Sequence, residues 1–178
     1  MVSRRGPESP PFHSGPPPVT LGDPAACYSK AVDSLARRSR SARGLERWLI
    51  QRRFAPEAIA SVIARLLDSG LLNDLAFART FAHSRVVGRG FGPRRVALEL
   101  SRQGVDRAMI DQVLAELAED RPEHAGPAAV ADAAGRRARA LARLEPAVAE
   151  RRLVSWLVRR GFGIGESARA ARGALGRR

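Results

Sequence analysis

The chain has 178 residues and a formal net charge of +13, with 31 lysines and arginines against 18 acidic residues. Aromatic residues make up only 5% of it, and no run alternates apolar and polar residues as a β-strand does, which excludes a β-rich fold. No stretch approaches the roughly 18 apolar residues of a membrane helix, and a single cysteine, Cys27, excludes an intramolecular disulfide. We therefore expect a soluble, cytoplasmic protein that does not associate with membranes.

Nearly all of the positive charge is arginine, because Lys30 is the only lysine. Arginine pairs bidentately with phosphates and carboxylates, so an arginine-rich surface suits nucleic acid or an acidic protein face. A genome of high GC content explains the preference for arginine over lysine equally well. It does not by itself explain the excess of positive over negative charge.

The first segment, residues 1–24, is rich in proline and shows no helical periodicity, so we expect a disordered tail there. A second break, EDRPEHAGP at 119–127, combines prolines, a glycine and acidic residues, and we assign a linker to 121–127. These breaks leave three segments for the folded body, at 25–72, 73–120 and 128–178.

A repeat recurs in each of these segments. Its copies are LERWLIQRRFAPEAIASVI (45–63), VALELSRQGVDRAMIDQVL (96–114) and LVSWLVRRGFGIGESARAA (153–171). In each copy an apolar residue is followed after four positions by leucine, and five positions later by another apolar residue. This spacing predicts a helix, a tight turn that carries an apolar plug, and a second helix. The aligned residues are Leu45, Leu49 and Phe54, then Val96, Leu100 and Val105, then Leu153, Leu157 and Phe162.

The expected ends of these helices carry matching signals. Pro56 suits a first helical position, and Asp106 suits the cap before a helix. Gly104 and Gly161 stand where a left-handed residue ends a helix.

A further helix precedes each pair, at roughly 26–38, 74–88 and 128–144, and Asn73 suits the cap of the middle one. In the third copy Ser167 and Ala171 replace larger apolar residues, so we expect its last helix to be poorly anchored. We predict an all-α protein of three tandem three-helix repeats that form an elongated, curved, solenoid-like body.

Enzyme chemistry has little support in this sequence. His13 lies in the expected tail, His124 in the linker, and His83 on a helix with no acidic residue one turn onward. No HExxH, CxxC, GxSxG or GxxxxGK[ST] motif occurs. We expect a protein that is not an enzyme, with no catalytic residue, no metal site and no cofactor.

The span RVVGRGFGPRRVALEL (85–100) places Gly88, Gly90 and Gly92 close together. A dinucleotide-binding G-x-G-x-x-G motif follows a strand, whereas these glycines follow a predicted helix. We interpret them as the bend between two helices, with Pro93 in the first turn of the second. The amides of that helix start and the arginines beside it could still hold a phosphate or a carboxylate of a partner.

Arginines recur at equivalent turns of the repeat. Solvated helix ends explain this, because basic residues complement the dipole of a helix C-terminus. A basic stripe along one face of a solenoid explains it equally well and suits a protein that follows a polyanion. We expect a core of partner-binding or DNA-binding residues, extended by a second set; the core is Arg85, Arg89, Arg94, Arg95 and Arg102, and the extension is Arg52, Arg53, Arg159 and Arg160.

The middle segment contains LLDSGLLNDLAFARTFAHSR followed by GFGPRRVALELSRQGVD. This combination resembles the RecX regulatory protein family, bacterial modulators of the RecA recombinase. AVDSLARRSRS (31–41) and LVSWLVRRGF (153–162) are similar to the family's first and third repeats, so the resemblance covers about 25–174. The matching residues of the middle segment are Leu66, Gly70, Leu71, Asn73, Asp74, Phe77, Ala78, Phe81, Arg85, Gly92, Glu99, Leu100, Gly104 and Val105.

The resemblance implies three tandem three-helix units and a regulator that lies along the groove of the RecA nucleoprotein filament. Such a protein restrains filament growth, ATP hydrolysis and strand exchange in DNA recombination, DNA repair and the SOS response. It also implies contact with single- or double-stranded DNA through the basic face, and we expect a monomer. The chain departs from the family at Gly44, in its alanine-rich last helix and in its tail.

Two alternatives remain open. Paired helices joined by a glycine turn also describe a helix-turn-helix, which predicts a protein that binds DNA directly. A plain helical-repeat scaffold would share the solenoid but carry a neutral or apolar groove.

Overall fold

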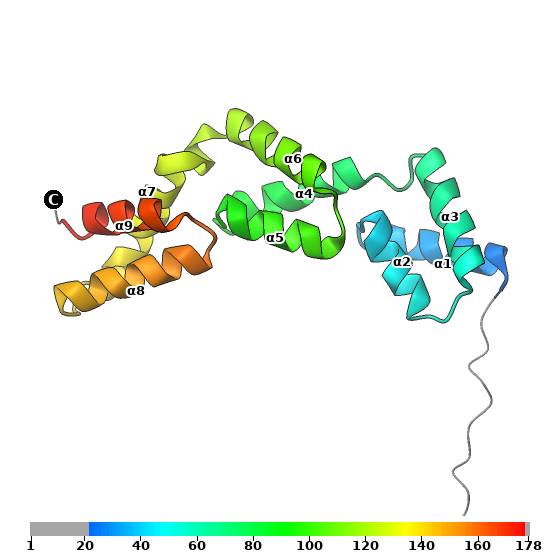
Figure 1. Ribbon diagram of the computed structural model, residues 1–178, viewed down its shortest axis with the longest axis horizontal. Helices are drawn as coiled ribbons and strands as arrows, with labels where there is room; N and C mark the ends of the chain where they lie inside the picture. The colour runs from blue at the N-terminus through cyan, green and yellow to red at the C-terminus, as the bar shows by residue number, and fades with distance from the viewer. Residues whose placement is uncertain (1–21, 177–178) are drawn as a thin grey trace, which may run out of the picture.

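The structure, a computed structural model, describes residues 22–176 and shows over that range only α-helices and two short 3₁₀ helices (Figure 1). The predicted all-α fold is thereby confirmed. Most of the predicted tail lies outside the described residues, and the first helix begins at Pro24. The elements are α1 (Pro24–Arg37), α2 (Ala42–Ile50), α3 (Pro56–Asp68), α4 (Asp74–Val86), α5 (Pro93–Gln103), α6 (Arg107–Asp120), η1 (Pro122–His124), α7 (Gly126–Ala138), η2 (Arg139–Leu141), α8 (Pro146–Arg159) and α9 (Ile164–Ala174).

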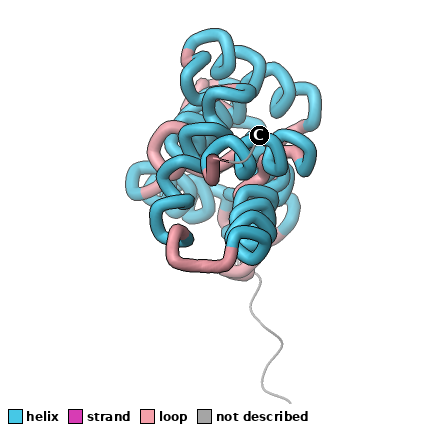
Figure 2. Tube along the Cα trace, turned by 90° about the vertical axis from the view of Figure 1, so that its left-hand side faces the viewer, coloured by secondary structure: helices cyan, strands magenta, loops and turns pink. Residues whose placement is uncertain are grey.

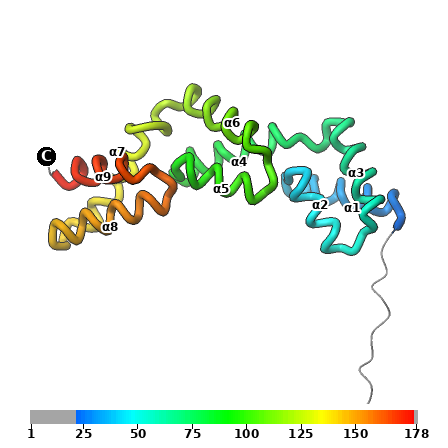
Figure 3. The backbone as a smooth tube through the Cα atoms, viewed as in Figure 1, coloured from blue at the N-terminus to red at the C-terminus, as the bar shows by residue number. Residues whose placement is uncertain are grey.

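The helices form three successive groups of three, α1–α3, α4–α6 and α7–α9, which follow one another along the long axis of an arched body (Figure 3). Viewed from one end, the groups lie behind one another as short helices connected by loops (Figure 2). Each group encloses its own cluster of buried apolar residues, so three small cores replace one large core. The elongated, curved repeat body predicted from the sequence is confirmed.

The turn between the second and third helix is the same in all three groups. The apolar plugs Phe54, Val105 and Phe162 are buried, with 5–6% of each residue exposed. The backbone N–H of each plug donates to the carbonyl of the leucine five residues earlier, at 3.4, 3.2 and 3.3 Å in chain order. The five-residue spacing between leucine and plug in the sequence therefore corresponds to the hydrogen bond that closes this turn.

The residue before each plug takes the left-handed conformation, with φ of 63° at Arg53, 84° at Gly104 and 97° at Gly161. A side chain at either glycine would collide with the neighbouring group: a Cβ on Gly104 would lie 2.5 Å from Cβ of Arg43, and one on Gly161 would meet the backbone nitrogen of Arg95. Arg53 lies at the outer end of the array, where it is exposed to solvent. Glycine is thus required where another group packs against the turn, and arginine is accepted where none of the described groups does.

The groups meet through the ends of their second helices. At the joint between α5 and α8, the amides of Gly92 and Arg94 donate to the carbonyls of Arg160 and Gly161, at 2.8 and 3.2 Å. At the joint between α2 and α5, the N-cap hydroxyl of Ser41 accepts from Gly44 N at 3.0 Å and donates to Gln103 O at 2.5 Å. The helices α8, α5 and α2 therefore lie end to end, each C-terminus against the next N-terminus.

Two expectations for the third group are wrong. α9 is firmly anchored: Ser167 and Ala171 are fully buried, and the helix packs against both α7 and α8. Ala171 belongs to the same apolar core as Ala133 and Ala134, so small side chains let α9 and α7 approach closely. The helix expected over 128–144 also ends early, at Ala138 followed by η2, because the chain must turn before α8 begins.

The left-handed turns generate a test of stability. We expect Gly161→Ala to lower the free energy of unfolding by about 2 kcal/mol or more, because it combines a left-handed alanine with a collision at the joint. Arg53→Gly at the equivalent outer position should change it by less than about 1 kcal/mol, since relief of strain there is offset by the entropy of glycine. Urea unfolding followed by circular dichroism measures both. Equal effects at the two positions would contradict the role assigned to the joint.

Candidate polyanion-binding surface

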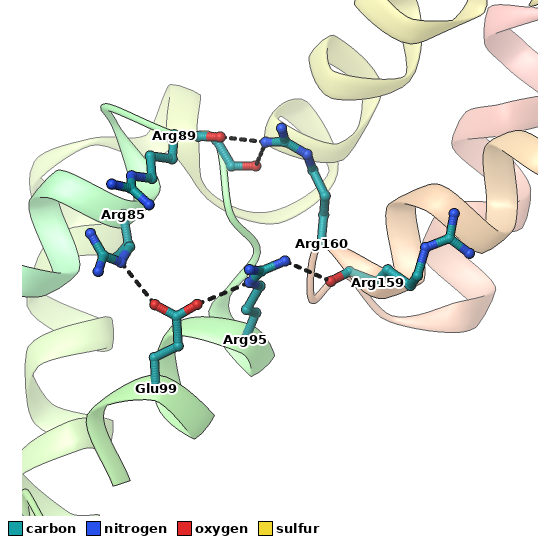
Figure 4. A network of polar contacts seen from close by, with 7 residues as sticks. Arg85, Arg89, Arg95, Glu99, Arg159 and Arg160 are labelled. Carbon is teal, nitrogen blue, oxygen red and sulfur yellow. Dashed lines mark hydrogen bonds and ion pairs between the residues drawn. The ribbon is translucent and has the colours of Figure 1, made fainter. Parts of the chain in front are cut away.

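The predicted arginines gather mainly at the joint between α5 and α8 (Figure 4). Arg85 lies in the last turn of α4 and Arg95 in the first turn of α5, and both guanidinium groups donate to the carboxylate of Glu99, at 2.8 and 3.0 Å. Arg85 also stacks on Phe81 and Arg95 on Phe91, with 4.3 and 3.9 Å from guanidinium carbon to ring centroid. These two arginines are therefore held in place within the chain.

Glu99 is the charge that balances this pair. Burial by itself would raise the pKa of Glu99, but the hydrogen bonds and the positive charges of Arg85 and Arg95 lower it below its usual value. Its side chain is 22% exposed, as is that of Arg85, so the pair is shielded from solvent more than a surface ion pair is. Glu99 was matched to the family pattern, but its role as counter-ion was not predicted.

Two further arginines reach across the joint. Nη1 of Arg160 donates to the backbone carbonyls of Arg89 and Gly90, the latter at 3.2 Å. Nη1 of Arg95 donates to the carbonyl of Arg159 at 3.3 Å. The carbonyl of Arg159 lies at the end of α8 and those of Arg89 and Gly90 in the turn after α4, where helical hydrogen bonding does not satisfy them. The guanidinium groups thus fasten the second group of helices to the third.

The remaining predicted residues are exposed and lie in three places. Arg89 and Arg159 lie at the joint between α5 and α8 (Figure 4). Arg94 lies at the same joint, where its amide donates to the carbonyl of Gly161. Arg102 lies at the opposite end of α5, where its carbonyl accepts from Arg47 at 2.9 Å. The last two, Arg52 and Arg53, follow α2 at the outer turn of the first group. The structure therefore brings together six of the nine predicted residues, at one joint.

Two open grooves flank the middle group of helices. The first-joint groove, of about 530 Å³, lies between α2 and α4; its charged lining residues are Arg38, Arg40, Arg47 and Arg85. The second-joint groove, of about 410 Å³, lies between the end of α4 and helices α7 and α8; its charged lining residues are Arg89, Arg136, Arg137 and Arg160. None of the described residues that line either groove is acidic.

Each groove contains one of the two tryptophans of the chain. Trp48 lines the first-joint groove with Arg52 and Arg40 stacked on its ring, at 3.5 and 5.2 Å from the centroid. Trp156 lines the second-joint groove with Arg160 and Arg137 at 4.5 and 5.8 Å. Neither tryptophan was predicted as a site residue, although the aligned repeat copies place both at the same position.

The arginines at the bottom of the grooves repel one another. The pKa of Arg40 lies below its usual value, first because of burial and then because of Arg38 and Arg52. Burial likewise lowers the pKa of Arg160, and Arg95 and Arg136 lower it further. An anion bound in either groove would relieve this repulsion.

The described residues, 22–176, include no group of three histidine, cysteine or acidic side chains that could hold a metal ion. No helix in the same range is long and apolar enough to cross a membrane.

The fold and surface describe a helical-repeat protein with basic joints, and comparison with known proteins identifies its family. Models of the first and second three-helix domains of RecX match residues 27–66 and 73–114. The Regulatory protein RecX of Streptomyces coelicolor is 35% identical over 136 residues, which cover 76% of this chain and 70% of that protein. A protein of the same name from Pseudomonas savastanoi pv. phaseolicola is 39% identical over 99 residues, or 56% of this chain and 63% of the relative. The chain belongs to the RecX family, as its sequence led us to expect.

Solved structures show the same fold. The crystal structure of RecX from Lactobacillus salivarius superposes with a TM-score of 0.71 at 18% identity and covers 85% of this chain and 96% of its own. A second, the crystal structure of regulatory protein RecX, has a TM-score of 0.69 at 19% identity and covers 86% of this chain and 71% of its own.

The ion pairs of Glu99 generate a test of stability and its pH dependence. We expect Glu99→Gln to lower the free energy of unfolding by about 1 kcal/mol at neutral pH, since two charge-assisted hydrogen bonds are weakened. The folded pKa of Glu99 is depressed, so its contribution is fully present above the unfolded pKa and is lost as pH falls through the folded value. The variant should therefore lose less stability on acidification than the parent protein does.

Glu46→Gln, at an exposed position on α2, removes the same charge and serves as the control. Urea unfolding at a series of pH values from neutral to acidic measures all three proteins. If the Glu99 and Glu46 variants gave the same acid dependence, the structural role of the Glu99 pairs would be refuted.

Proposed function

We propose that this protein is a non-catalytic regulator that binds in the groove of the RecA nucleoprotein filament. In this proposal it restrains filament growth, ATP hydrolysis and strand exchange, and so acts in the cytoplasm in DNA recombination, repair and the SOS response. Membership of a family whose relatives carry the name regulatory protein supports the regulatory part. The observation that carries the rest is the form of the molecule, an arched row of three helical units with arginines collected at its joints.

The mechanism we propose is steric and electrostatic. An elongated body contacts several subunits of a helical polymer at once, so several weak contacts act together. The exposed arginines Arg89, Arg94 and Arg159 lie at one joint, and acidic protein surface or DNA phosphates would pair with them. A body held in the groove in this way blocks the addition of subunits or the entry of a second DNA strand.

The structure favours this mechanism over a helix-turn-helix that reads duplex DNA. The first turn of α5 faces the carbonyls of α8, so its N-terminus is occupied within the chain. The third helices of the groups begin with acidic residues, Glu57 in α3, Asp106 before α6 and Glu166 in α9, which would face the phosphates at a groove edge. Electrophoretic shifts on random duplexes over a range of salt test this alternative, which predicts binding to one sequence that persists at high salt.

Charge reversal tests the filament proposal. At stoichiometric amounts the parent protein should slow ATP hydrolysis and strand exchange by the cognate RecA. We expect Arg89→Glu with Arg94→Glu to raise the concentration needed for half inhibition by at least about tenfold, because repulsion replaces attraction at the contact. Arg95 is left unchanged, since it holds Glu99 and the carbonyl of Arg159.

The control reverses Arg143 and Arg169, which are exposed in the third group, with Arg143 near the end of α8 remote from the joint. This control protein carries the same net charge as the test variant and should inhibit like the parent protein. A parent protein that leaves RecA activity unchanged would refute the proposed function.

A further inference from the structure

The segment between α1 and α2, residues 38–41, exposes one serine among arginines. Its sequence is Arg-Ser-Arg-Ser, and Arg37 precedes it at the end of α1. Both ends of the segment have extended backbone, with φ and ψ of −157° and 127° at Arg38 and of −74° and 163° at Ser41. Ser39, between them, is exposed to solvent. Its hydroxyl therefore lies on a short, extended stretch that the active site of a modifying enzyme can reach.

The hydroxyl of Ser39 is not used by the fold, unlike those of the two nearest serines. Ser34 is buried, and its Oγ accepts from Nε of Arg40 at 2.9 Å. Ser41 is also buried, and its Oγ donates to Gln103 O at 2.5 Å. Oγ of Ser39 makes no hydrogen bond within residues 22–176. A group attached to this oxygen therefore breaks no hydrogen bond of that part of the chain.

The surroundings of Ser39 favour a negative charge. Ser39 lines the first-joint groove together with Arg38, Arg40 and Arg47, and none of the described residues that line this groove is acidic. Burial, and after it the charge of Arg38, already lowers the pKa of Arg40. A phosphate on Ser39 would lie among these guanidinium groups, relieve their repulsion and accept charge-assisted hydrogen bonds from them.

We propose that Ser39 is a phosphorylation site for an ATP-dependent serine kinase that selects basic segments. The acidic substrate cleft of such a kinase pairs with Arg37, Arg38 and Arg40. Oγ of Ser39 attacks the γ-phosphorus of ATP, the bond from that phosphorus to the bridging β–γ oxygen breaks, and ADP leaves. The hydroxyl proton passes to a base of the kinase. The product carries a charge of about −1.5 to −2 at neutral pH and neutralises arginines of the first-joint groove.

The repeat restricts this modification to one joint. When its register is extended back from Leu45, the positions that align with Ser39 are Gly90 and Ala147, which have no hydroxyl. Phosphorylation would therefore lower the positive charge of the first-joint groove and leave the second-joint groove unchanged. This inference goes beyond the proposed function, because the modification and its contacts are measured without RecA.

Transfer of labelled phosphate tests the site. The full chain is incubated with an extract of the cells that produce it and with ATP labelled in the γ-phosphate, and tandem mass spectrometry locates the label. Labelling of other proteins shows that kinases in the extract are active. We expect phosphate on Ser39, and Ser39→Ala should lose that label.

Ser69→Ala is the matched control. Ser69 is the other exposed serine outside a helix in residues 22–176, but it follows Asp68, and its Oγ donates to Leu66 O at 3.2 Å. This variant should be labelled like the parent protein. A parent protein without phosphate on Ser39 would overturn the proposal, as would transfer to Ser69 equal to that on Ser39.

Phosphorus NMR tests the contacts of the phosphate. Full chains that carry phosphoserine at position 39 or at position 69, introduced during translation, are titrated with acid and base. The guanidinium groups should lower the second pKa of the phosphate at position 39 below its ordinary value of about 6. The charge of Asp68 should keep the pKa at position 69 from falling. Equal pKa values at the two positions would refute the predicted contacts.

A substitution in the phosphorylated chain identifies the arginines. Arg38→Gln should return the pKa of the phosphate at position 39 toward its ordinary value, because Arg38 is exposed beside it and lines the same groove. Arg143→Gln removes the same charge at an exposed position in the third group and should leave that pKa unchanged. Equal effects of the two substitutions would show that the net charge of the protein, and not the first-joint groove, acts on the phosphate. A labelled Ser39 in a protein that leaves RecA unaffected would refute only the proposed function.

Discussion

The end-to-end contact of the second helices is the constraint on which the rest of the molecule depends. Helix ends leave amides and carbonyls without partners, and in an isolated three-helix unit water would have to satisfy them. Here the amides of Gly92 and Arg94 meet the carbonyls of α8, and Ser41 bridges α2 to α5. At both joints the negative C-terminal end of one helix dipole lies against the positive N-terminal end of the next, which is a favourable arrangement. The small cores hold each unit together, and these polar joints set how the units follow one another.

The joints also determine where the arginines can act. Near the joint, backbone carbonyls that no amide of α5 satisfies carry partial negative charge, and guanidinium groups collect around them. Arg95 and Arg160 donate to these carbonyls, and Glu99 neutralises part of the remaining charge. The remaining positive charge is exposed at Arg89, Arg94 and Arg159 and in the two grooves. From the sequence, the recurring arginines had two explanations: they complement helix ends, or they form an exposed basic stripe. At the second joint the structure contains arginines that bond to helix-end carbonyls and others that are exposed.

The sequence predicted the parts of the fold that depend on local spacing. The distance from leucine to plug, the caps at Asn73 and Asp106, and the left-handed Gly104 and Gly161 follow from contacts within one turn. The prediction that α9 is poorly anchored was wrong. It rested on the loss of large apolar side chains from the repeat, and the sequence pattern does not show how closely two helices lined with small residues approach. The partner arginines stay a prediction, and the internal use of Arg160 was beyond reach because its acceptors lie 70 and 71 residues away. The tryptophan grooves were within reach, since the aligned copies place Trp48, Glu99 and Trp156 together.

That position of the repeat also distinguishes the three similar units. A tryptophan ring there faces the groove and stacks with nearby arginines, whereas the carboxylate of Glu99 forms ion pairs with them. The middle unit, which has a neighbour on both sides, carries the carboxylate and is the unit most tightly fastened at both ends of α5. The outer units carry the rings, and Arg40 and Arg160 beside them bond to neutral acceptors, the hydroxyl of Ser34 and the carbonyls of Arg89 and Gly90. Arg160 links the two roles, since it donates to carbonyls of the second joint and also lines the groove beside Trp156.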